Sequence, residues 1–230
     1  MNQYREGKVK STPTRGVKQY LKPNAYNQSE LDWTLMTICT TKVRIITTRE
    51  INMSDLAVVT DGTFAVVGLL LGLINMGVNH CPNEGCLARN EPTPYLGLSV
   101  GDLVFQEKTV GEEIFIRKQT GIARGPFQFT YGVSITDEGG LWVGLGNTTT
   151  YSTPNERWYA QFHSMPGLYA RGGDVALGGP IEFRSGIELG YQNREGVRIG
   201  LGADHRSNAG IYSNNPGVET VHFRVSIPTK

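Results

Sequence analysis

The sequence predicts an all-β fold, an eight-stranded antiparallel transmembrane β-barrel, over residues 91–230. Segments from residue 95 onward alternate apolar and polar side chains with a period of two, which is typical of strands with two different faces. Glycine, asparagine, aspartate and proline separate the segments, as in consecutive hairpins. A sheet of eight strands can close on itself, and closure leaves no unpaired edge in a hydrocarbon environment.

Overall composition excludes several classes of protein. The chain has 22 Lys and Arg against 21 Asp and Glu, so its charge gives no sign of a nucleic-acid-binding surface. Its 29 glycines follow no three-residue period, which excludes collagen. A hydrophobic content of 39% is enough to bury a core or to coat a surface that faces lipid, so disorder is not expected.

The amino-terminal part differs from the rest of the chain. Residues 1–52 are polar and show no sustained periodicity, so we expect a poorly ordered extension. Residues 53–90 form a signal-like segment and linker, in which 63–78 is a run of sixteen residues without a charge. This run is shorter than a typical spanning helix and resembles the apolar region of an export signal that starts at Met53. Asp55 and Asp61 lie where such a signal prefers basic residues, and a buried helix or an uncleaved anchor is the alternative.

Cys81 and Cys86 follow the apolar run in the sequence CPNEGC. In an exported chain they could close a small disulfide loop. A metal site would need more ligands than the nearby His80 supplies.

Eight strands are expected in the remainder, and many reach about ten residues, the length with which a tilted strand crosses a membrane. In the last of them Val221, Phe223 and Val225 alternate with His222 and Arg224. In chain order, the expected strands are 95–103, 111–120, 124–136, 140–150, 156–165, 180–192, 196–207 and 217–228.

The polar face of these strands indicates which side of the barrel meets lipid. It carries charged side chains among glycines, a set that suits a narrow interior filled by side chains. We therefore expect the apolar face to point outward, while a soluble lipocalin-like barrel or sandwich would turn it inward. The side chains on the polar face are Glu182, Arg184, Glu188, Arg198, Asp204, His222 and Arg224. Like His222, His163 falls on this face and is expected to form hydrogen bonds in the interior rather than to act in catalysis.

The last hairpin brings together a candidate catalytic triad. His205 and Ser207 are two residues apart, so they share the apolar face of their strand. Glu219 opens the next strand in phase with its apolar face, and antiparallel pairing places it near His205 and Ser207 at one rim. A hydroxyl, an imidazole and a carboxylate in this order form a nucleophile, a base and the group that orients the base. The alternative is that polar residues at a barrel rim have no catalytic role.

The segment HRSNAGIYSNNPGVE resembles the motif of the outer-membrane lipid A 3-O-deacylases of the PagL type. In that family a His-x-Ser-Asn-x-Gly run precedes an Asn-Pro loop and a Glu fourteen residues after the His, which is the spacing from His205 to Glu219. The similarity continues through GPFQFTYGVSITDEGGLWVGLG and the C-terminal strand, and covers about residues 95–230. Residues 1–90 have no counterpart in it.

This resemblance implies a carboxylic ester hydrolase in the Gram-negative outer membrane, with an active site that faces the bilayer. It implies that Ser207 is the nucleophile, His205 the general base and Glu219 the residue that orients the imidazole. Asn208 and Asn215 match asparagines of the motif and are assigned to oxyanion stabilisation or loop ordering, and Gly210 and Gly217 to turn geometry.

The expected reaction is hydrolysis of the 3-O-linked 3-hydroxyacyl chain of lipid A in lipopolysaccharide, without a metal or organic cofactor. The alternatives are a non-catalytic eight-stranded outer-membrane barrel, as an adhesin or structural protein, and a soluble barrel that binds a lipid inside. The residues leave open whether the barrel is a monomer or a homodimer.

Overall fold

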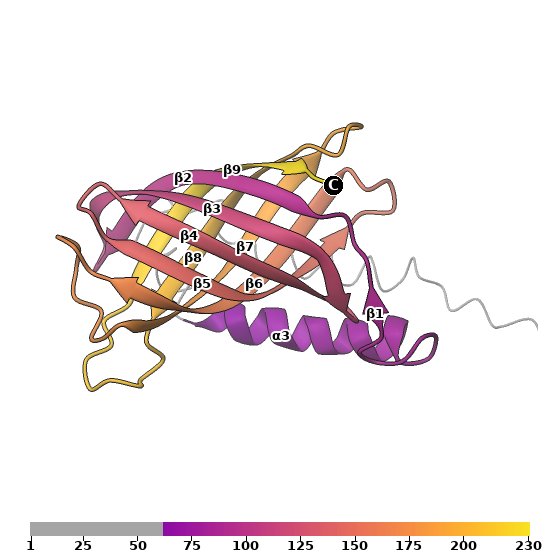
Figure 1. The fold of residues 1–230 in the computed structure, drawn as a ribbon, viewed down its shortest axis with the longest axis horizontal. Coiled ribbons are helices and arrows are strands. Elements are labelled where there is room, and N and C mark those ends of the chain that lie inside the picture. The colour runs from indigo at the N-terminus through magenta and orange to yellow at the C-terminus, as the bar shows by residue number, and fades with distance from the viewer. Residues whose placement is uncertain (1–61) are drawn as a thin grey trace, which may run out of the picture. The chain divides into compact units, whose positions relative to one another are not determined.

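The computed structural model describes residues 62–230, so the predictions for residues 1–52 lie outside the described residues. Strands β2 to β9 form one antiparallel sheet that closes through a pairing between β3 and β4 (Figure 1). The predicted eight-stranded barrel is therefore confirmed. Its strands are β2 (Tyr95–Phe105), β3 (Lys108–Arg124), β4 (Phe127–Thr136), β5 (Leu141–Ser152), β6 (Trp158–Ala170), β7 (Ile181–Gln192), β8 (Arg198–Ser207) and β9 (Val218–Pro228).

The first hairpin is tighter than the sequence predicted. Strands β2 and β3 are joined by Gln106 and Glu107 alone, with φ angles of 48° and 68°. Turns with two left-handed residues usually carry Asn or Gly, which cost little in this conformation. Because Gln and Glu give no such signal, the prediction began β3 at residue 111, three residues too late. A two-residue strand, β1 (Arg89–Asn90), pairs with the far end of β3 and was not predicted.

Strand β6 runs past Pro166, although the prediction ended this strand at residue 165, directly before the proline. Pro166 pairs with Phe183 on the β7 side, but the ladder to β5 is interrupted between the pairs Asn147–Ser164 and Gly144–Gly167. Proline has no N–H to donate, which accounts for the local gap. The register is the same on both sides of the gap, so the strand continues to Ala170.

The apolar face of every strand points outward, as predicted, and not inward as in the soluble alternative. Leu201 in β8 is 67% exposed, while its chain neighbour Gly200 is buried. The exposed apolar residues of the outer wall include Leu98 and Val100 in β2, Ile114 and Ile116 in β3, Tyr131, Val133 and Ile135 in β4, Leu141, Val143 and Leu145 in β5, Leu189 in β7 and Phe223 and Val225 in β9.

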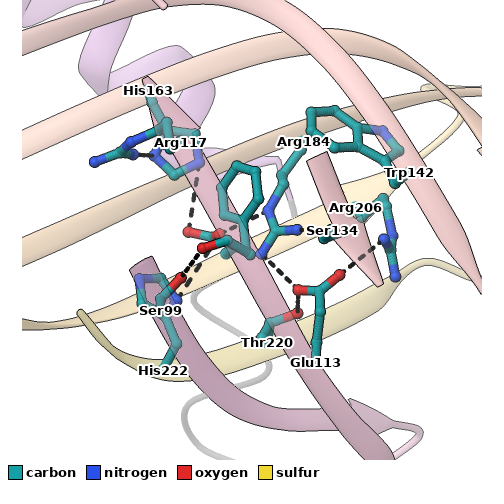
Figure 2. Close-up of polar contacts among 12 residues, drawn as sticks. Ser99, Glu113, Arg117, Ser134, Trp142, His163, Arg184, Arg206, Thr220 and His222 are labelled. Carbon is teal, nitrogen blue, oxygen red and sulfur yellow. Dashed lines mark hydrogen bonds and ion pairs between the residues drawn. The ribbon is translucent and has the colours of Figure 1, made fainter. Parts of the chain in front are cut away.

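The barrel interior is filled by paired charges. Arg184 lies between two carboxylates, with Nη2 2.7 Å from Glu113 Oε2 and Nε 2.7 Å from Asp204 Oδ2 (Figure 2). Its guanidinium also stacks over the Phe115 ring. Arg206 Nη1 reaches the other oxygen of Glu113 at 3.1 Å. Buried charges are tolerated when they are paired and hydrogen-bonded in this way.

A second cluster of interior charges surrounds Glu188. Arg224 Nη1 and Arg117 Nη2 lie 2.7 and 3.1 Å from Glu188 Oε2. His163 lies inside the barrel with Nδ1 2.9 Å from Arg117 Nη1 (Figure 2). His222 is also inside, with Nδ1 3.9 Å from an oxygen of Asp204. The predicted polar interior is confirmed, and both histidines lie in it. Within the described residues His163 forms a side-chain hydrogen bond there, as predicted, whereas the ring nitrogens of His222 form none.

The uncharged run in the amino-terminal segment forms helix α3 (Thr63–Asn75), which continues as a π-helix, η1 (Met76–His80). Together they are long and apolar enough to cross a membrane, a property that an export signal and a retained anchor share. The helix lies along the barrel wall (Figure 1), where a Cβ atom on Gly68 would lie 2.8 Å from Phe162 Cβ. After η1, the structure joins Cys81 and Cys86 by a disulfide, so CPNEGC forms a closed loop.

Candidate active site

Strands β8 and β9 bring His205 and Glu219 together, as predicted from the sequence. The two residues are direct register partners, and His205 Nδ1 lies 3.2 Å from Glu219 Oε1. His205 is buried and Glu219 is half-buried, although both lie on the outward face of the sheet. A carboxylate at this nitrogen orients the imidazole, and in such an arrangement the other ring nitrogen, Nε2, is the one that transfers a proton.

Ser207 is the last residue of β8 and shares the outward face with His205. It pairs with Phe183 of β7 and is half-buried at the rim. Residues two apart on a strand are separated by about 6–7 Å along the chain, and within the described residues no hydrogen bond joins the Ser207 side chain to the His205 ring. All three predicted triad residues thus lie at one rim and on one face.

Both asparagines of the motif belong to the loop that joins β8 to β9. Asn208 is fully buried, and its Nδ2 donates to the carbonyls of Leu177 and Asn214, each at 2.7 Å. Its backbone N–H donates to Asn215 Oδ1 at 2.9 Å, and its own Oδ1 accepts from Gly210. Of the two predicted roles for Asn208, the geometry matches loop ordering, because both hydrogens of its amide are already used.

The two glycines of the loop have backbone conformations that suit their predicted role in turns. Gly210 and Gly217 have φ angles of 78° and 69°, in the region that L side chains rarely adopt. A Cβ atom on Gly217 would lie 2.6 Å from His205 Cε1, so this glycine packs directly against the imidazole. Ala209 also has a positive φ, 53°, which nothing in the sequence indicated.

The chain neighbours of His205 fix the strand from inside. Asp204 and Arg206 point into the barrel, where they bind Arg184 and Glu113, respectively. Because side chains alternate along a strand, these interior contacts hold His205 on the outer wall. On the other side, the register partner of His205 is Ser185 of β7, a buried residue that sequence reasoning did not single out.

Within residues 62–230, no group of three His, Cys, Asp or Glu side chains is placed to hold a metal ion.

Comparison with known proteins identifies a family model that matches part of the chain. The family model described as Lipid A 3-O-deacylase (PagL) matches residues 116–228, a range that contains all the predicted site residues. A solved structure titled "Crystal structure of the outer membrane enzyme PagL" is similar to 59% of this chain and 99% of its own, with 18% identity and a TM-score of 0.48. A designed protein, titled "De novo design of transmembrane beta-barrels", is similar over 60% and 99%, with 10% identity and a TM-score of 0.44. No curated protein matches the sequence.

Proposed function

Residues 116–228 belong to the lipid A 3-O-deacylase (PagL) family, and on this premise we propose that the protein is an outer-membrane hydrolase that removes the 3-O-linked acyl chain of lipid A. The contact between His205 and Glu219, with Ser207 on the same face, is the observation that carries the proposal. It supplies a base with an orienting acid beside a hydroxyl, which is the arrangement that ester hydrolysis through an acyl-enzyme requires.

The proposed reaction has two halves. Ser207 Oγ attacks the ester carbonyl while His205 Nε2 takes the serine proton, and the imidazolium then gives that proton to the departing sugar oxygen. Water next attacks the acyl-enzyme, with His205 again as the base, and the fatty acid leaves as Ser207 regains its proton. Glu219 stabilises the imidazolium in both halves, and no metal or organic cofactor takes part.

The two asparagines take different roles in this proposal. Asn208 holds the loop, because its amide hydrogens bind the carbonyls of Leu177 and Asn214. Asn215 uses Oδ1 to accept from the Asn208 backbone, so its Nδ2 is the amide that we assign to the oxyanion.

The substrate is proposed to arrive sideways from the bilayer. The triad lies on the outer face, which continues along β8 as the exposed apolar residues Ile199 and Leu201. The interior offers no path for an acyl chain, since buried pairs such as Arg224 with Glu188 fill it. A lipid held in the membrane can therefore present its ester to Ser207 without leaving the hydrocarbon layer.

Mass spectrometry of lipid A tests the proposal. Lipid A incubated with the protein in detergent is expected to lose one 3-hydroxyacyl chain, with release of the corresponding fatty acid. The Ser207→Ala protein, which should fold, is the matched control and should leave lipid A intact. Unchanged lipid A with the unaltered, folded protein would favour the non-catalytic barrel instead.

A further inference from the structure

A row of polar side chains crosses the outer wall from the proposed triad. Asn147 of β5 pairs with Ser164 of β6, Ser164 with Ser185 of β7, and Ser185 with His205 of β8. His205 pairs in turn with Glu219 of β9. These five residues, here called the polar row, are consecutive register partners on five neighbouring strands.

The serines and Asn147 point to the outside of the barrel. Their chain neighbours His163 and Arg184 lie in the interior, so Ser164 and Ser185 lie on the opposite face. Asn147 is exposed and shares its face with Leu145, which is 55% exposed.

The polar row slopes from the rim towards the middle of the barrel. Glu219 and His205 lie at the rim ends of β9 and β8, whereas Asn147 and Ser164 lie near the centres of β5 and β6. Three strand spacings separate His205 from Asn147, about 15 Å. The partners beyond its ends are the apolar residues Phe129 and Val104. A band of interfacial residues would follow the rim, so position at the interface does not explain this row.

Three members of the polar row, Asn147, Ser164 and Ser185, have side chains without a hydrogen-bond partner among residues 62–230. A polar group placed in hydrocarbon without a hydrogen bond costs free energy, so three in one line are costly unless a ligand binds them.

The end of the polar row that lies farthest from the triad borders a cavity. Asn147 and Ser164 line a cavity of about 330 Å³ between α3 and the barrel wall, together with Thr149 and Phe162. The cavity keeps room beside these side chains with α3 in place, and removal of α3 during export would open the same wall to the bilayer.

We propose that the polar row is a subsite for the oxygen atoms that the substrate lipid carries on its acyl chains, below the level of the headgroup. The ligand class is a lipid with hydroxyacyl or acyloxyacyl chains, and the inference rests on the proposed function because it places that lipid beside His205. A serine hydroxyl donates to an ester carbonyl or accepts from a chain hydroxyl, and the Asn147 amide does both. A plain alkyl chain would leave these groups without partners, so the row selects against it. Asn147, Ser164 and Ser185 are specificity residues in this proposal, and none of them takes part in the chemical step.

Two matched synthetic glycolipids test the inference, identical except that the acyl chains of one carry a hydroxyl and those of the other do not. The first measurement is hydrolysis of both by the unaltered protein in detergent, which tests the proposed function. The second is equilibrium binding of both to the Ser207→Ala protein, with and without Ser164→Ala and Ser185→Ala. We expect binding of the hydroxylated lipid to weaken by about fivefold to tenfold when both serines are replaced, and binding of the plain lipid to stay within about twofold.

Two further variants separate this role from a structural one. Ser185→Thr keeps a hydroxyl in the row and should retain the preference for the hydroxylated lipid. Tyr191→Phe removes a hydroxyl from the outward face of β7 six residues along the strand from Ser185, outside the row, and should also leave the preference unchanged.

Different results would refute the deacylase and the subsite. A folded protein that hydrolyses neither lipid but loses its binding preference with the serines would overturn the deacylase and support the subsite. Hydrolysis with the same binding preference before and after the serine replacements would overturn the subsite and leave the deacylase standing.

Discussion

His205 of β8 and Glu219 of β9 face each other across the last hairpin, with Nδ1 of the imidazole 3.2 Å from Oε1 of the carboxylate. Glu219 comes fourteen residues after His205 in the chain, yet strand pairing makes them direct neighbours. Their relationship depends on register, because a slip of one residue would turn either side chain to the other face. The interior contacts of Asp204 and Arg206, on either side of His205, oppose such a slip.

Replacement of the triad residues is expected to give a graded loss of activity. Ser207→Ala and His205→Ala should each lower kcat by several orders of magnitude, because the nucleophile and base act as a unit. The loss of kcat in Glu219→Ala should be about 10²-fold smaller than in these two variants, since an orienting acid contributes less than the groups it orients. Deacylation rates with purified lipid A measure the effect, and heat-dependent gel migration checks that the barrel is folded. Full activity of Ser207→Ala would refute the mechanism.

The packing of Gly217 against the imidazole predicts a difference between two glycine substitutions. Gly217→Ala and Gly210→Ala both place a Cβ on a residue with positive φ, which costs about 1–2 kcal/mol in each case. Only at Gly217 would the new atom meet His205, at 2.6 Å from Cε1, whereas the space around Gly210 is open to 4 Å. We expect Gly217→Ala to lower kcat by at least about tenfold through displacement of the imidazole, and Gly210→Ala to lower it much less. Equal effects on kcat would show that backbone strain alone, and not His205, responds.

The strands, their outward face and the pairing of His205 with Glu219 could be predicted because each follows from local alternation or from one hairpin. The turn at Gln106 and Glu107 could not, since neither residue type signals a left-handed conformation. Ser185 also escaped notice, because a serine among alternating apolar residues looks ordinary until the register of β7 with β8 places it beside His205. The interior partners are similarly hidden from sequence. Glu113 and Arg184 lie 71 residues apart, and only closure of the barrel brings them within 2.7 Å.

Removal of the central interior carboxylate should destabilise the barrel. Glu113→Gln would leave Arg184 and Arg206 without their shared partner, and loss of one member of a buried ion pair costs about 3–5 kcal/mol. Glu112→Gln is the control, because this neighbouring side chain is exposed and its replacement should change stability by no more than about 0.5 kcal/mol. Urea unfolding in detergent micelles gives both free energies, and equal values would contradict the role of the interior network.

Export tests the role of the segment that contains α3. If the chain from Met53 carries an export signal, an expressed protein that starts there should reach the outer membrane and lose its apolar segment. N-terminal sequencing of the mature protein identifies the cut. A mature protein that still carries residues 1–52 would contradict this prediction, and one that keeps α3 alone would identify the helix as a retained anchor packed through Gly68.

The orientation of the barrel wall is tested by substitutions on β8, because lateral access to the triad depends on it. Leu201 is 67% exposed and lies on the same face as His205, so we expect it to contact acyl chains. Leu201→Arg should destabilise insertion by about 2–4 kcal/mol at the bilayer midplane and by less towards the interface. Two single-cysteine variants report the environment of each face directly. Both carry Cys39→Ser, because Cys39 is the cysteine that remains beside the Cys81–Cys86 disulfide and would also take up the label. A spin label at Leu201→Cys should be accessible to oxygen dissolved in the lipid, whereas a label at Ser226→Cys, a buried position on the inner face of β9, should not. If the label at position 226 were accessible to oxygen in the lipid and the label at 201 were not, Ser207 would point into the barrel. A lipid would then have to enter the lumen through the charges that fill it.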